Sequence, residues 1–161
     1  MGRDKETQEK RGDILTEQKH WREGIPTHEN VVYACFGGMS NTGITAALAS
    51  MRAVEELGLE KACIGCLAGL PTNVQSVYGK TKAARRIITV DGCPFECGRK
   101  VVEAAGFKVA KSIVLVRDIG MKKKAFHEDI GTKDLKSLME YISEEDVRKA
   151  KELIVKAITE E

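Results

Sequence analysis

The sequence predicts an α/β fold built on a small parallel sheet of about four strands. Three observations lead to this prediction. Short apolar runs rich in β-branched residues alternate with longer stretches whose apolar residues recur at helical spacing. Turns that contain glycine separate most of these segments. Each strand-like run is also followed by enough chain for a crossover helix, so consecutive strands cannot form hairpins and should lie parallel.

The first strand is expected over residues 31–36, an apolar run that ends at two glycines. A helix should follow over about 41–57, because its apolar positions keep helical spacing and a glycine comes directly after it. Ser40 or Asn41 would cap this helix. A weaker second strand is expected over 61–64.

The middle of the chain continues this alternation. Thr72 and Gln75 have the spacing of a capping box, which predicts a helix through about residue 84. Residues 86–90 are the clearest strand in the sequence, because they combine β-branched residues with an apolar pattern.

A third helix is expected to begin with Pro94 at its first position and to stop at Gly106. A fourth strand should cover residues 112–116, followed by a short helix near 133–141. The last helix should begin at Ser143, where three acidic residues in the first turn favour the positive end of the helix dipole.

Right-handed crossovers between parallel strands place helices on both faces of the sheet. We therefore expect a three-layer domain of the Rossmann-like or flavodoxin-like type, with strand order 2-1-3-4. This single α/β domain should span residues 30–161. Residues 1–29 are highly charged and lack a sustained apolar stripe, so a helical or disordered arm is expected there.

The charge balance and the apolar pattern restrict the partners. The chain has 26 basic and 24 acidic residues, which does not favour nucleic acid or an anionic membrane as a partner. Its longest uncharged stretch, 31–51, is interrupted by glycines and polar residues, and the first residues lack the apolar core of a secretory signal. We expect a cytoplasmic protein that binds neither nucleic acid nor membrane. The sequence is compatible with a small anionic substrate, with a protein partner and with a homo-oligomer.

The cysteines are the most informative residues. There are five, namely Cys35, Cys63, Cys66, Cys93 and Cys97. An odd number without an export signal argues against a disulfide framework and favours metal, iron–sulfur or thiol chemistry. They come at or just after the ends of the first three predicted strands. Because the carboxyl ends of parallel strands meet at one edge of a sheet, these thiols should converge there.

A tetrahedral metal site needs four ligands, and thiolates are good ones. Cys35, Cys93 and Cys97 are the clearest three candidates, with Cys66 preferred as the fourth and Cys63 as its rival. Cys93 near the helix cap and Cys97 in the first turn would share one helix face, where the dipole lowers the pKa of a thiol. Alternatively, Cys63 and Cys66 both contribute ligands and Cys35 is a nucleophile.

Several other residues have simpler interpretations. The segment from Gly38 to Gly43 is spaced like a phosphate loop, but Ile44 stands where the lysine would be, so a tight turn is the preferred interpretation. Asp91 should accept hydrogen bonds from amides of the loop around Cys93. Arg117 and Asp118 are expected to form a surface ion pair.

Four segments resemble a known family. They are ACFGGMSNTG at 34–43, CLAG at 66–69, DGCPFEC at 91–97 and VLVRDIGMKK at 114–123. In this order they are similar to the DGC-motif family, whose members are described as zinc-binding proteins with four shared cysteines. The resemblance runs from about residue 31 to residue 124. It implies that the zinc ligands are Cys35, Cys66 or Cys63, Cys93 and Cys97, and it implies no particular reaction.

The sequence thus predicts a zinc-binding protein with a cysteine-thiolate site at the carboxyl edge of a parallel sheet. Two alternatives use the same thiols. One is an iron–sulfur protein, because cysteine spacing alone does not exclude a cluster. The other is a redox or sulfur-transfer enzyme in which Cys93 attacks and Cys97 or Cys35 resolves the intermediate.

Overall fold

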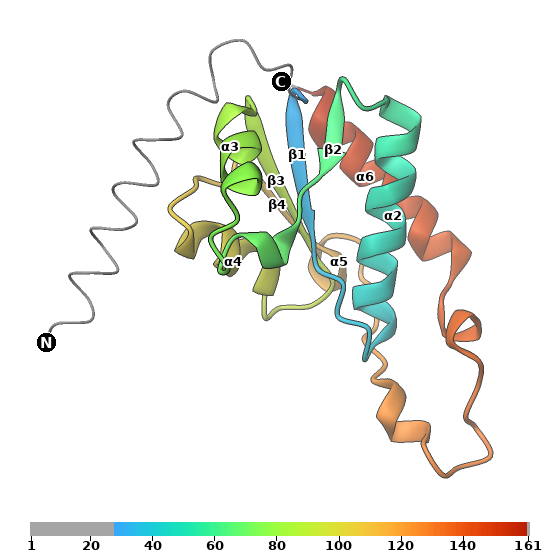
Figure 1. The fold of residues 1–161 in the computed structure, drawn as a ribbon. Helices are drawn as coiled ribbons and strands as arrows, with labels where there is room; N and C mark the ends of the chain where they lie inside the picture. Colours follow the sequence, from blue (N-terminus) through green and yellow to red (C-terminus); the bar gives the residue numbers. More distant parts are fainter. Residues whose placement is uncertain (1–27, 161) are drawn as a thin grey trace, which may run out of the picture.

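The computed structural model describes residues 28–160, and its centre is one parallel sheet of four strands. The strands are β1 (Asn30–Ala34), β2 (Ala62–Ile64), β3 (Arg86–Asp91) and β4 (Lys111–Val114). Their order is β2-β1-β3-β4, which confirms the predicted α/β class and strand order (Figure 1). The predicted arm lies outside the described residues except for its last two.

Helices cover both faces of the sheet. On one face lie α2 (Asn41–Leu57) and α6 (Glu144–Thr159), and on the other lie α3 (Gln75–Ala83) and α4 (Cys97–Ala104) (Figure 1). Alternate residues of β1 point to opposite faces, so Val32 joins the cluster with α2 and α6 while Tyr33 joins the cluster with α3 and α4. The predicted three-layer, Rossmann-like layout is therefore confirmed.

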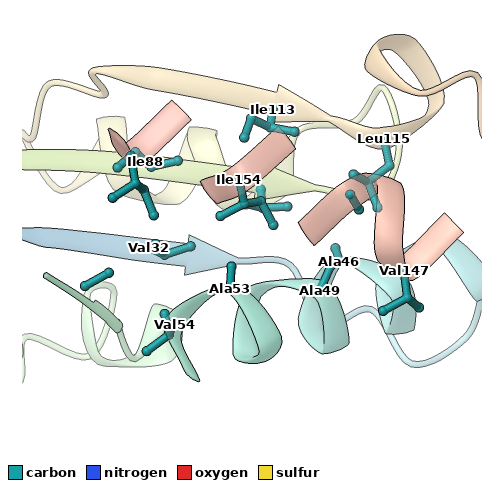
Figure 2. Packing of buried hydrophobic residues seen from close by; sticks show 14 of the residues in the cluster. Val32, Ala46, Ala49, Ala53, Val54, Ile88, Ile113, Leu115, Val147 and Ile154 are labelled. Atoms are coloured by element: carbon teal, nitrogen blue, oxygen red, sulfur yellow. The ribbon is translucent and has the colours of Figure 1, made fainter. Parts of the chain in front are cut away.

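The larger core cluster lies between the sheet and the pair α2 and α6. Small residues of α2 let this helix approach the sheet closely, while large aliphatic residues fill the space from the strands and α6. Figure 2 shows this packing, with Ala46, Ala49, Ala53, Val32, Ile88, Ile113, Val147 and Ile154 among its members.

Several helix ends agree with the sequence pattern. Ser40 is the N-cap residue of α2, Gly58 ends that helix with φ +83°, and Ser143 caps α6 by accepting the N–H of Asp146. Within residues 28–160, no helix is both long and apolar enough to cross a bilayer.

Two predicted helix starts are wrong. No capping box forms at Thr72, whose hydroxyl donates to the carbonyl of Ala68 (2.6 Å), and α3 begins at Gln75 itself. Pro94 is not in a helix, because Glu96 adopts a left-handed conformation (φ +49°) and α4 begins only after it.

The segment after β3 also differs from the prediction. The fourth strand ends at Val114, where the chain turns into the short helix α5 (Leu115–Asp118), because the carboxylate of Asp118 accepts the Val114 N–H (2.8 Å). The helix expected near 133–141 is reduced to η4 (Leu138–Tyr141). Two further 3₁₀ turns are η2 (Leu67–Gly69) and η3 (Phe126–Asp129).

Candidate functional site

Cysteines follow three neighbouring strands at the carboxyl edge of the sheet. Cys35 comes directly after β1, Cys66 is the second residue after β2, and Cys93 is the second residue after β3. Since β1 lies between β2 and β3, Cys35 is flanked by the other two chain segments. Cys97 is the first residue of α4, which packs on β3 and β1. The topology therefore brings four cysteine-bearing segments to one edge.

Cys35 lies in the middle of this edge and is half-buried. Its backbone N–H donates to the carbonyl of Val90 (2.8 Å), and its sulfur accepts hydrogen bonds from the N–H groups of Gly37 and Gly92. Burial raises the pKa of the Cys35 thiol, and the nearby Asp91 and Cys97 add to this, while the two amides oppose it. Cys35 and Cys97, from distant parts of the chain, are thus close enough to interact electrostatically.

Glycines allow the turns after β1 and β3 to touch through their backbones. A Cβ atom on Gly92 would lie 2.5 Å from the carbonyl carbon of Thr42, and one on Gly43 would overlap the carbonyl oxygen of Gly37. A side chain at position 92 would push the two turns apart, whereas one at position 43 would distort the turn after β1 itself. This contact holds the turn that follows Cys35 against the one that carries Cys93, as expected for a tight turn.

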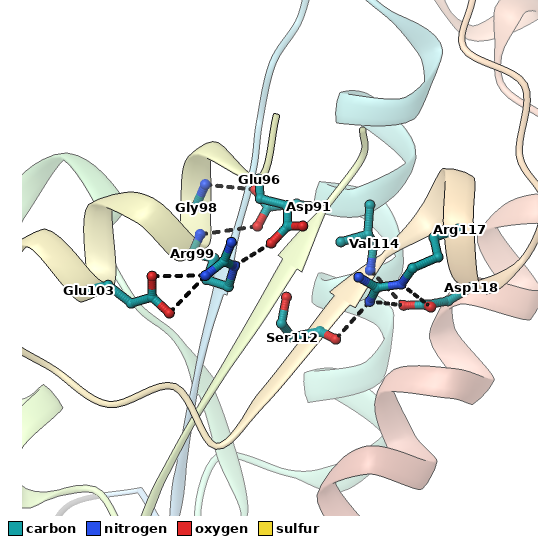
Figure 3. Close-up of polar contacts among 9 residues, drawn as sticks. All are labelled: Asp91, Glu96, Gly98, Arg99, Glu103, Ser112, Val114, Arg117 and Asp118. Carbon is teal, nitrogen blue, oxygen red and sulfur yellow. Dashed lines mark hydrogen bonds and ion pairs between the residues drawn. The ribbon is translucent and has the colours of Figure 1, made fainter. Parts of the chain in front are cut away.

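Asp91 fixes the start of α4. Its buried carboxylate accepts the N–H groups of Gly98 (2.7 Å) and Arg99 (3.1 Å), which are the second and third residues of that helix (Figure 3). These are the amides that an N-cap side chain normally satisfies. Glu96, the actual N-cap residue, makes no such bond and pairs with Arg99 instead. The predicted bonds from Asp91 to the Cys93 loop are therefore replaced by bonds to α4, whose first residue is Cys97.

Cys93 lies in a turn and not in a helix. Its carbonyl accepts the N–H of Glu96 (3.2 Å), and α4 begins four residues later. The prediction that Cys93 and Cys97 share a helix face is therefore wrong, because Glu96 interrupts the backbone with its left-handed conformation. A contribution from the helix dipole applies to Cys97 alone.

Cys63 and Cys66 have different surroundings. Cys63 lies inside β2 opposite Val31, and packs with Val31 and Tyr33 against the α3 and α4 side of the sheet. Burial raises its pKa to about 11, with a small opposing effect of Lys80. Cys66 is exposed and caps η2, which packs against α4. Of the pair, only Cys66 therefore lies beyond the end of its strand.

Two groups of ion pairs lie near this edge. Arg117 forms an ion pair with Asp118 (2.7 Å) and donates to the carbonyl of Ser112, which confirms the predicted surface pair (Figure 3). Arg99 bridges the carboxylates of Glu96 and Glu103. His127 lies in η3, whose first residue Phe126 donates its N–H to the carbonyl of Met39, and His28 precedes β1 at the opposite edge.

The sequence pattern gave no indication of a cleft beside Cys66. It has a volume of about 620 Å³ and is lined largely by apolar side chains. Met51 is part of it, on a position of α2 that faces away from the core. An exposed apolar residue on the outer face of an amphipathic helix was the available signal, but such residues are common on protein surfaces.

The four cysteines carried by these segments are sulfur donors of the kind that thiophilic metals prefer. Their thiols are not gathered into a formed site. In residues 28–160, no three side chains among His, Cys, Asp and Glu form a group that could hold a metal ion. Sulfur ligands in fours are typical of zinc and of iron–sulfur clusters. Cys66 and Cys97 are exposed, whereas Cys35 is half-buried.

Comparison with known proteins gives one match. The family model described as DGC domain matches residues 31–142, from β1 to the residue before the cap of α6. Searches of the curated proteins and of the solved structures give no match.

Proposed function

This chain belongs to the DGC-domain family, and from that premise we propose that it is a zinc-binding protein with a cysteine-thiolate site at the carboxyl edge of the sheet. The proposed ligands are Cys35, Cys66, Cys93 and Cys97. The observation that carries the proposal is the topology of the sheet, which brings the chain segments that carry these four cysteines to one edge.

Burial and position support Cys66 over Cys63 as the fourth ligand. Metals bind the thiolate, and a thiol with a pKa of about 11 is almost entirely protonated at neutral pH. Cys63 is also enclosed by the side chains around Tyr33 and lies within its strand. Cys66 is exposed and follows the strand, so its thiol reaches the edge without disturbing the core.

The chain prepares the site in two ways. The amides of Gly37 and Gly92 donate to the sulfur of Cys35 and so favour its thiolate form. Asp91 holds the first turn of α4 and thereby positions Cys97. Zinc bound by four thiolates is usually closed to further ligands and supplies stability, so we propose a binding role and no particular reaction.

Metal analysis of single-cysteine variants tests the proposal. We expect the purified full chain, reconstituted with Zn²⁺, to hold about one zinc ion per molecule. Substituting serine for Cys35, Cys66, Cys93 or Cys97 should lower the affinity by at least about tenfold. Cys63→Ser is the matched control and should keep the wild-type zinc content.

Three results would overturn parts of this proposal. Absence of zinc after reconstitution would overturn it as a whole. A loss of zinc in Cys63→Ser with full retention in Cys66→Ser would show that Cys63, and not Cys66, is the fourth ligand. A brown protein with charge-transfer absorption after anaerobic purification would replace zinc by an iron–sulfur cluster on the same cysteines.

A further inference from the structure

A cleft opens at the carboxyl edge of the sheet, on the side of β1 where β2 ends. Its volume is about 620 Å³, within the range of pockets that hold small organic molecules. Its walls come from the end of β1, from α2, from the segment around η2 and from α4. The lining residues include Phe36, Met51, Ile64, Cys66, Leu67 and Val101.

The chemistry of the walls selects an apolar ligand. Among residues 28–160, none that lines the cleft carries a charge, and the remaining members are alanine, glycine and proline. Three large apolar side chains of the cleft are also exposed to water, namely Phe36 (71%), Ile64 (41%) and Met51 (50%). A ligand that covers them removes this apolar surface from water, at roughly 25 cal/mol for each Å².

The backbone on the η2 side of the cleft is fixed before any ligand binds. Gly65 donates its N–H to the carbonyl of Val32 (2.8 Å), and a Cβ atom at this glycine would lie 2.5 Å from the ring of Tyr33. Gly69 packs equally closely on Val77 of α3. A preformed wall lowers the entropic cost of binding.

We propose that this cleft binds the apolar body of a small uncharged molecule and places it against the thiol of Cys66. The site also lies at the carboxyl ends of the strands, where open α/β sheets bind their ligands. The role of Cys66 as neighbour of both cleft and metal rests on the proposed function. The cleft itself depends on apolar walls that do not require zinc.

A fluorescence titration with N-phenyl-1-naphthylamine, an uncharged apolar probe, tests the cleft. The full chain as purified should bind the probe saturably, at about one molecule per chain. Met51→Lys places a charge in the cleft and should weaken binding about tenfold or more. Met139→Lys is the matched control, because Met139 is equally exposed (53%) but lies outside the cleft, and it should bind like the wild type.

A second pair of variants tests the volume. Ala68→Trp fills the cleft and should abolish binding, whereas Ala104→Trp, on the exposed surface of α4, should not. Unsaturable binding of the probe, or equal binding by Met51→Lys and Met139→Lys, would overturn the proposal that the cleft binds an apolar ligand. The zinc content is measured in the same samples. A protein that holds zinc but does not bind the probe contradicts only the proposal for the cleft. A protein that binds the probe but holds no zinc contradicts only the metal proposal.

Discussion

Burial distinguishes the thiol of Cys63 from an ordinary cysteine thiol. Cys63 has a pKa raised from 9.0 to about 11 by its position inside β2. We predict that iodoacetamide modifies Cys63 in the folded protein about a hundredfold more slowly than in the chain unfolded in guanidinium, because the thiolate fraction falls tenfold per pKa unit. Mass spectrometry of the labelled peptides measures both rates.

The pH dependence of this labelling separates the thiol pKa from simple shielding. Between pH 8 and pH 10, the rate at Cys63 should rise about tenfold for each pH unit, because the thiol is still largely protonated throughout. A rate that levels off near pH 9 would contradict the raised pKa.

Asp91 shows how a single residue can act through non-local contacts. We predict that Asp91→Ala lowers the free energy of unfolding by about 2 kcal/mol, because the amides of Gly98 and Arg99 lose their acceptor. Asp91→Asn should lose less, since its carbonyl oxygen still accepts one of these bonds. Urea denaturation measures the loss.

The control for Asp91 is the exposed Asp134, whose replacement by alanine should leave stability within about 0.5 kcal/mol of the wild type. Equal stability of both alanine variants would show that Asp91 does not cap α4. The sequence placed Asp91 just after a strand, whereas it is the last residue of β3, and the left-handed backbone at Glu96 moved the helix start and so changed which amides Asp91 meets.

At the scale of elements, close backbone contacts within the turn after β1 decide which glycines are required. Gly43 lies in the first turn of α2, where helix propensity alone would favour alanine by about 1 kcal/mol. A Cβ atom there would overlap the backbone of Gly37. We therefore predict that Gly43→Ala destabilises the protein by about 2 kcal/mol or more, against its propensity.

Gly38→Ala is the matched control in the same turn. Its Cβ atom would lie 3.9 Å from Ile44, an ordinary contact, so thermal unfolding should change little. If Gly43→Ala raised the unfolding temperature, the close backbone contact between Gly43 and Gly37 would be refuted. The tight turn could be predicted from the sequence, because Ile44 stands where a phosphate loop would have a lysine. The contact of this turn with Gly92 could not be predicted, because it joins segments far apart in the sequence.

For the whole molecule, periodicity and strand spacing were sufficient to predict the fold. Apolar runs such as 86–90 are buried on both faces, and the crossover rule then places helices on both sides of the parallel sheet. The position of the thiols at strand ends followed from the same rule. The burial of Cys63 and the cleft beside Cys66 did not, since both depend on where β2 ends and on side chains from four different segments.

The last helix belongs to the fold although the family match ends at residue 142. From α6, the side chains of Val147, Ala150 and Ile154 enter the same core cluster as the strands and α2. We predict that Ile154→Ala lowers the free energy of unfolding by about 3 kcal/mol, because it leaves a cavity in a fully buried position. Glu152→Ala, on the exposed face, should change it by less than about 0.5 kcal/mol.

A truncated chain that ends at residue 142 extends this prediction. Without α6, the apolar residues of α2 and of the sheet on this face lose their cover, so we expect aggregation or loss of cooperative unfolding in circular dichroism. A truncated chain that still unfolds cooperatively at the wild-type midpoint would show that the core does not need α6. If zinc binding also disappears on truncation, we expect the loss to follow from the disrupted sheet, because every proposed ligand lies within the family match.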